Sequence, residues 1–115
     1  MKLSRLLLFV VAVSFNVLAM PKTEIEHLLN YVSSTHCQYE RNGDMHTGQE
    51  AVEHIKKKYD YYDEEIETAE DFIEYSATKS TLSGAPYKIH CEGQAPTTSR
   101  VWLLAELARY RKSRD

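Results

Sequence analysis

The two cysteines of this 115-residue chain are the feature that most constrains its fold. A bond between Cys37 and Cys91 would close a loop of about 55 residues and contribute roughly 4 kcal/mol, mainly by restricting the unfolded chain. That is a large share of the roughly 5–15 kcal/mol by which small domains are stable. An even number of cysteines in an exported chain favours a disulfide. Whether the N-terminus directs export therefore decides whether we expect the two cysteines to form a disulfide.

The first twenty residues, MKLSRLLLFVVAVSFNVLAM, have the pattern of a secretory signal peptide. Lys2 and Arg5 give a positive start, an apolar run follows, and Val17 and Ala19 supply the small residues of a cleavage site. The apolar run is shorter than the roughly 20 residues that a membrane span needs. We therefore expect cleavage after Ala19 and a single mature domain, residues 20–115, in the periplasm without stable membrane insertion.

Loss of the leader makes the chain more acidic. Removing Lys2 and Arg5 lowers the number of Lys and Arg residues from 14 to 12 against 17 Asp and Glu, so the formal net charge changes from −3 to −5. An acidic chain has no net positive potential to attract phosphates over a broad face. We therefore expect no nucleic-acid partner.

Four segments that begin with threonine or serine predict helix starts. TEIE at Thr23, TGQE at Thr47 and TAED at Thr68 each place an acid three residues after the threonine, which is the arrangement of a capping box. A fourth start falls at Thr98 or Ser99. Apolar residues at helical spacing follow each start and predict core-facing stripes. For the last helix the expected stripe is Val101, Trp102, Leu104, Ala105 and Ala108, with Leu103 and Leu107 beside it.

Two short segments alternate instead and predict strands. CQYER (37–41) and YKIHCE (87–92) each place a cysteine and a tyrosine on one face. If the strands pair antiparallel with the cysteines opposite each other, Tyr39 faces Ile89, and Glu40 faces Lys88 in a favourable cross-strand pair. Residues 42–44 (Asn-Gly-Asp) and residues 83–86 (Ser-Gly-Ala-Pro) predict turns.

The expected order of elements is therefore helix, strand, helix, helix, strand, helix. This order predicts a small α+β domain that is mainly helical, with a short antiparallel two-stranded ribbon. The cysteine pair would join the ends of that ribbon.

The segment HTGQEAVEH (46–54) places two histidines on either side of a glutamate at four-residue intervals. If Thr47 caps a helix, His46 lies outside it, Glu50 turns back to the cap, and His54 lies one turn further along. The three side chains then need not converge, and the two-histidine helix motif of zinc proteases is absent. We interpret the segment as a helix start and keep a metal site as the alternative.

Other sequence patterns give no catalytic centre. His36-Cys37 and His90-Cys91 resemble a four-ligand zinc set, but neighbouring residues on a strand point to opposite faces. A bonded cysteine is not a nucleophile, and no glycine-rich phosphate loop or serine-hydrolase motif occurs. The many acids of residues 60–74 are typical of a solvated face.

Several segments of the chain resemble a known family of small exported bacterial proteins, the YfeK-like proteins. The resemblance runs from about Ile25 to Arg111 and rests on RNGDMHTGQEAVEHIKKKY, ETAEDFIEYSATKSTLSGAPYKIHCEG and WLLAELARYR. The residues that carry it are Arg41-Asn42-Gly43, His46, Glu50-Ala51, His54, Lys58, Thr68-Ala69-Glu70, Phe72-Ile73, Ser83-Gly84 and Pro86-Tyr87. It implies a periplasmic bacterial protein and no activity, cofactor or catalytic residue.

We expect a non-catalytic periplasmic domain that binds another periplasmic protein or an envelope component. The candidate contact surface is formed by residues near one turn and one helix start: Arg41, His46, His54 and Lys58. Two alternatives stay open, a metal-binding protein that uses His46, Glu50 and His54, and an envelope enzyme with an unrecognised acid–base pair. No cofactor is expected, and the sequence does not give the oligomeric state.

Overall fold

Four helices and a four-stranded antiparallel sheet make up the part of the chain that the structure, a computed structural model, describes, residues 21–115. The expected leader, residues 1–19, lies outside the described residues. The elements in chain order are α2 (Pro21–Ser34), β1 (Gln38–Arg41), β2 (Asp44–His46), α3 (Gly48–Tyr61), the 3-10 turn η1 (Asp63–Glu65), α4 (Ala69–Ser76), β3 (Lys88–His90), β4 (Thr97–Thr98) and α5 (Ser99–Ser113).

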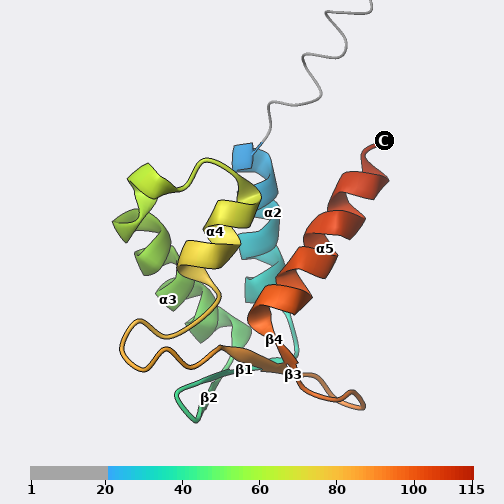
Figure 1. Cartoon of the computed structure of the whole chain (residues 1–115). Coiled ribbons are helices and arrows are strands. Elements are labelled where there is room, and N and C mark those ends of the chain that lie inside the picture. Colours follow the sequence, from blue (N-terminus) through green and yellow to red (C-terminus); the bar gives the residue numbers. More distant parts are fainter. Residues whose placement is uncertain (1–20) are drawn as a thin grey trace, which may run out of the picture.

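The helices pack against one another and stand on the sheet, which forms one end of the molecule (Figure 1). Helices α2 and α4 run toward the sheet, whereas α3 and α5 run away from it. This packing of neighbouring helices lets each helix bury its apolar stripe against the others. The predicted mainly helical α+β class is confirmed.

The centre of the sheet has the register that the sequence predicts. Strands β1 and β3 pair antiparallel, with Tyr39 opposite Ile89 and Glu40 opposite Lys88. The disulfide between Cys37 and Cys91 continues this register just outside the strands, with the two Cα atoms 4.4 Å apart. The predicted disulfide and the predicted antiparallel pairing are therefore both confirmed.

The sheet is wider than the predicted two-stranded ribbon, because its order is β2-β1-β3-β4. Asn42 and Gly43 have φ angles of 53° and 83° and form a two-residue hairpin turn that leads directly into β2. Strand β4 pairs with β3 through Thr97 and Thr98 before α5 begins. The expected charge pair also differs, since Glu40 meets the diagonal neighbour His90 at 2.7 Å rather than Lys88.

Capping boxes begin two of the helices, as the sequence predicts. The Thr47 side chain accepts from the Glu50 amide while the Glu50 carboxylate accepts from the Thr47 amide, and Thr68 and Asp71 repeat the arrangement. Thr98 caps α5 through the Val101 amide. The expected start of the first helix at Thr23 was wrong, because Thr23 lies inside α2.

The core lies between the helices and the upper face of the sheet. Tyr39, Tyr87 and Ile89 enter it from the sheet side, and the helices contribute most of the other buried apolar residues. They are Ile25, Leu28, Val32, Ala51, Val52, Ile55, Ala69, Phe72, Ile73, Leu103 and Leu107. The expected stripe of α5 is confirmed only in part: Trp102 and Leu104 pack against the core, but the fully buried residues are Leu103 and Leu107, and Val101 is 55% exposed.

Helices α2 and α3 approach closely where α3 begins. Gly48, the first residue of α3, is buried, and a Cβ atom at this position would overlap the carbonyl oxygen of Val32 and touch Thr35. The glycine is therefore required for close packing of two backbones. This contact fixes the direction in which α3 leaves the β1–β2 hairpin.

Candidate functional site

A shallow pocket lies where the middle of α3 meets β1 and the residue before β3. It measures about 200 Å³, a volume that includes open solvent. Its lining residues come from three separate parts of the chain and are Tyr39, Arg41, Ala51, His54, Ile55 and Tyr87. Four of the lining residues, Tyr39, Ala51, Ile55 and Tyr87, are at most 3% exposed, so the hollow itself offers little accessible surface.

The local structure explains why these residues meet. The Asn42–Gly43 turn ends β1 at Arg41, and the Thr47 capping box then sets the start of α3. Residues four apart on a helix share a face, so His54 and Lys58 both project toward the sheet side. The backbone of Tyr87 is held on both sides, since its amide donates to Thr78 (3.0 Å) and its carbonyl accepts from Ser99 (2.8 Å).

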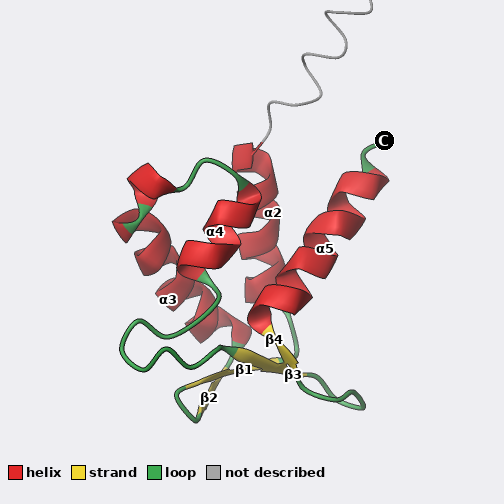
Figure 2. Cartoon of the chain, in the orientation of Figure 1, coloured by secondary structure: helices red, strands yellow, loops and turns green. Residues whose placement is uncertain are grey.

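The loop of residues 77–87 leads to Tyr87 and is bonded to elements on either side of the pocket. It runs beside α3 and the β1–β2 hairpin (Figure 2). Asn42 donates to the Ser80 hydroxyl at 3.1 Å and accepts from the Ser83 hydroxyl at 2.6 Å. Lys58 Nζ donates to the Lys79 carbonyl oxygen at 2.7 Å. These bonds tie the loop to both the hairpin and the helix.

The hydroxyl of Tyr87 is the centre of the polar contacts. Tyr87 is only 2% exposed, and its hydroxyl lies 3.1 Å from His54 Nε2 and accepts from Lys58 Nζ at 3.3 Å. The Lys58 ammonium also lies over the Tyr87 ring, 5.2 Å from its centroid. A buried tyrosine hydroxyl needs hydrogen-bond partners, and His54 and Lys58 satisfy that need.

Positive charge accumulates around this hydroxyl and shifts the ionisation of its neighbours. Burial lowers the pKa of His54 below its usual value, and the charges of Arg41 and Lys58 lower it further, as do Lys57 and His46. Burial likewise lowers the pKa of Lys58, with Arg41 and Lys79 contributing. Burial raises the pKa of Tyr87, although Arg41 opposes this shift. His54 is therefore neutral and Tyr87 protonated at pH 7.

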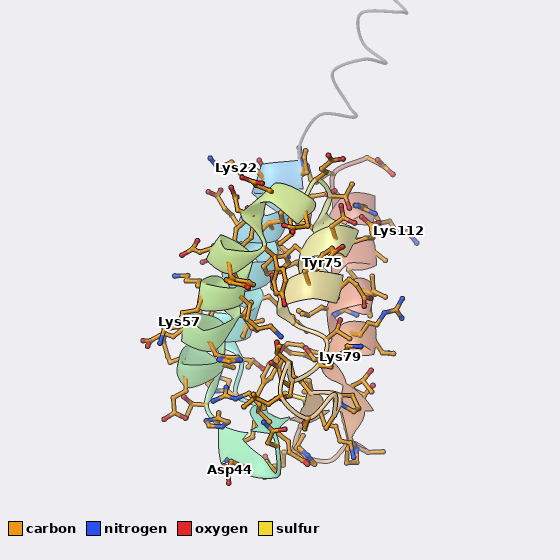
Figure 3. The ribbon with its side chains drawn as sticks, turned by 60° about the vertical axis from the view of Figure 1, so that its left-hand side comes forward. Lys22, Asp44, Lys57, Tyr75, Lys79 and Lys112 are labelled. Atoms are coloured by element: carbon orange, nitrogen blue, oxygen red, sulfur yellow. A yellow bond between two sulfur atoms is a disulfide. The ribbon has the colours of Figure 1, made fainter. Side chains whose placement is uncertain are left out.

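No carboxylate balances this charge within residues 21–115. The ion pairs of the described part of the chain occupy Arg100, Arg109 and Arg111, but none includes Arg41 or Lys58. Figure 3 shows Lys57 on the outer side of α3 and Lys79 near the level where the helices meet the sheet. The result is a cationic rim around a small pocket in an otherwise acidic protein.

The structure brings together three of the four residues of the predicted contact surface. Arg41 and His54 line the pocket, and Lys58 donates to its central hydroxyl. His46 lies at the end of β2, where its Nδ1 is 3.7 Å from Glu50 Oε1. The sequence did not identify Tyr87 as the central residue. The available signal was a large aromatic residue beside a predicted strand, with a hydroxyl that would need partners once buried.

The alternative metal set of His46, Glu50 and His54 is not assembled as a chelating cluster. Glu50 completes the helix cap and approaches His46, whereas His54 turns toward Tyr87. Within the described residues, no three His, Cys, Asp or Glu side chains are placed to hold a metal ion. Both cysteines are committed to the disulfide, so the two His-Cys pairs do not form a zinc site.

The acid–base alternative finds His54 and Tyr87 in contact, with His54 Nε2 3.1 Å from the Tyr87 hydroxyl oxygen. A general acid or base works best with a pKa near the operating pH. Burial raises the pKa of Tyr87 away from neutrality, so its hydroxyl is poorly suited to that role.

The fold and site together define a small disulfide-bonded α+β domain with a cationic pocket. Within residues 21–115, none of the helices is both long enough and apolar enough to cross a lipid bilayer. The chain belongs to a family of unknown function, DUF5329, which matches residues 19–111. It is also 37% identical over 73 residues to the uncharacterized protein YfeK of Salmonella typhimurium.

The match to this relative covers 63% of the present chain and 61% of the relative, so the chain spans about three fifths of the relative's length. No solved structure matches the chain. The expected resemblance to the YfeK-like proteins is therefore confirmed.

Proposed function

We propose that the chain is an exported, non-catalytic binding domain of the bacterial cell envelope, which uses the pocket around Tyr87 to contact an acidic partner. The observation that carries this proposal is the unbalanced positive charge of Arg41 and Lys58 at the pocket. Uncompensated cations beside a partly desolvated pocket attract a partner of opposite charge and suppress cationic partners.

Two features support export to the periplasm. The first twenty residues have the order of positive, apolar and small residues that directs secretion. The disulfide between Cys37 and Cys91 is typical of proteins that fold in an oxidising compartment. Fractionation of cells that express the full chain, with thiol labelling of each fraction, tests both. A cytosolic protein with free thiols would contradict export.

The partner itself can be sought by photo-crosslinking in living cells. A photoreactive residue replaces Lys57, which is exposed on α3 beside His54, and in a matched variant it replaces Lys112 on α5 (Figure 3). We expect a discrete adduct from position 57 and none from position 112. The substitution Arg41→Gln in the first variant should abolish the adduct, because it removes the cation that lines the pocket.

Two results would contradict this function. Adducts of the same mass from positions 57 and 112 would show that contact is not confined to the pocket face. An adduct at position 57 that persists with Arg41→Gln would show that the cationic rim does not recognise the partner. The variant's circular dichroism spectrum should match that of the parent, so that loss of the adduct reports on binding.

A further inference from the structure

We propose that a tyrosine patch, formed by Tyr61, Tyr62 and Tyr75, is a docking surface for an arginine-bearing segment of a partner protein. The patch lies at the end of α3 and on α4, whereas the pocket around Tyr87 lies beside the first half of α3. No residue of the tyrosine patch lines that pocket, so the inference goes beyond the proposed function.

The three rings of the tyrosine patch touch one after another and bridge two helices. The rings of Tyr61 and Tyr62 meet edge to face with 4.8 Å between their centroids, and those of Tyr62 and Tyr75 lie 5.3 Å apart. Figure 3 shows Tyr75 where α4 lies beside α3. Contacts between the rings restrain the side chains, which lowers the conformational entropy that is lost when a partner binds.

Helix packing accounts for only part of the tyrosine patch. Tyr62 is half-buried, and its contact with Tyr75 joins α3 to α4. Tyr61 is 80% exposed and Tyr75 is 39% exposed, so much of both rings remains in solvent. Single exposed apolar residues are ordinary, but contiguous exposed rings are typical of contact sites, where tyrosine is enriched. The exposure of Tyr61 is therefore explained by a partner and not by the core.

Carboxylates surround the tyrosine patch and determine the charge of its occupant. Residues 59–78 contain eight acids and no Lys, Arg or His. Glu70 and Glu74 pair with arginines of α5, and Asp71 completes the cap of α4. The other acids form no ion pair within residues 21–115 and are Asp60, Asp63, Glu64, Glu65 and Glu67. Such a surface attracts a cationic partner and repels an anionic one.

The nearest lysines on α3 do not remove this negative potential. Lys57 lies one turn before Tyr61, but it forms no ion pair with any residue that the structure describes. Burial raises the pKa of Tyr59, and the carboxylates of Asp63 and Asp60 raise it further. Negative charge therefore prevails at the end of α3, and a cation docks on the side of Tyr61 that faces η1.

An arginine side chain suits these features better than a lysine or a sugar does. The planar guanidinium stacks on aromatic rings and can bind a carboxylate through two N–H groups at once. The lysine ammonium is a compact and strongly hydrated charge, so it gains less from an exposed ring. A neutral sugar could stack on the rings, but the surrounding carboxylates would not attract it.

Nuclear magnetic resonance titration of the oxidised protein with a diarginine peptide, acetyl-Gly-Arg-Gly-Arg-Gly-amide, tests the proposal. We expect saturable shifts of the ring signals of Tyr61, Tyr62 and Tyr75, and weaker binding as the salt concentration rises. The same peptide with citrulline in place of arginine is neutral and should bind at least about fivefold more weakly. An absence of saturable shifts up to about 10 mM diarginine peptide would overturn the proposal.

Matched variants separate the tyrosine patch from the overall charge. Tyr61→Ala should weaken binding of the diarginine peptide about three- to fivefold, because an exposed cation–π contact is lost. Leu82→Ala changes a residue that is 95% exposed on the 77–87 loop and should leave binding unchanged. Glu64→Gln/Glu65→Gln should weaken binding, whereas Glu53→Gln, an exposed acid in the first half of α3, should not. Equal effects within either pair of variants would overturn the proposal.

Two further probes and one experiment in cells test the choice of occupant. Spermidine that binds as tightly as the diarginine peptide would overturn the choice of an arginine-bearing segment. A trisaccharide of N-acetylglucosamine that shifts the same ring signals would overturn the choice of a cation. In cells, a photoreactive residue in place of Glu64 should give a discrete protein adduct that Tyr61→Ala reduces and Leu82→Ala does not. An adduct that Tyr61→Ala leaves unchanged would contradict docking on the tyrosine patch.

Discussion

Replacing both cysteines with alanine should cost about 4 kcal/mol of the free energy of unfolding. The disulfide joins residues 54 positions apart and so closes a loop of about 55 residues. In the chain-entropy model, such a loop removes about 14 cal/mol/K from the unfolded chain, or about 4 kcal/mol at 25 °C. Cys37 and Cys91 are only partly buried, so alanine removes little packing in addition. The variant should remain folded only if the parent is more stable than this.

Urea unfolding of the parent, the Cys37→Ala/Cys91→Ala variant and the parent in reductant measures the effect. The last two should coincide, since both lack the same constraint. Their m-values should exceed that of the oxidised parent, because an uncrosslinked unfolded chain exposes more surface. A loss below about 1 kcal/mol with an unchanged m-value would refute the entropic reasoning. A large loss with an unchanged m-value would place the effect in the folded state.

Four further substitutions test other parts of the structure, each by urea or thermal unfolding. Thr47→Ala removes the capping hydroxyl of α3 and should cost about 1 kcal/mol. Gly48→Ala should cost about 2 kcal/mol or more despite alanine's higher helix propensity, because the added Cβ overlaps a backbone carbonyl of α2. Tyr39→Phe leaves a buried serine hydroxyl unpaired and should cost about 1–2 kcal/mol. The pKa of His54 is lowered in the folded protein, so below pH 6.5 the unfolded state binds more protons at this residue than the folded state does. The free energy of unfolding should therefore fall as the pH decreases through this range, and His54→Gln should remove that part of the decline.

The features that the sequence predicted well are determined by nearby residues or by one strong pairing. A threonine with an acid three positions later correctly indicated the caps at Thr47 and Thr68, although the same pattern at Thr23 lies inside α2. The β1–β3 register follows from the cysteines, because placing Cys37 opposite Cys91 leaves Tyr39 opposite Ile89. These predictions required no knowledge of how the helices pack.

The outer strands and the buried face of α5 could not be predicted in the same way. Strand β2 has three residues, exposed or half-buried, and β4 has two, so neither shows an alternating pattern. Apolar residues surround α5, and spacing alone did not select the face that contains Leu103 and Leu107. The neighbouring helices decide that face, because α5 packs against both α2 and α4.

The candidate site was predicted in part for the same reasons. His54 and Lys58 share a face of one helix, and Arg41 precedes the turn that leads to that helix, so their proximity follows from local structure. Tyr87 lies 33 positions from His54 in the sequence, and only the pairing of β3 with β1 brings it to the pocket. A tyrosine at a predicted strand end indicates burial, but not which groups satisfy its hydroxyl.

The contacts that hold the fold together also position the pocket. Strand β1 ends in Arg41, β3 follows Tyr87, and the register between these strands is the one that the disulfide continues at the other end of the pair. Helix α3 receives its direction from the cap at Thr47 and the close approach at Gly48. The pocket therefore forms where two independently fixed elements meet. Loss of the disulfide should lower the population of folded protein while leaving the pocket of the molecules that remain folded intact.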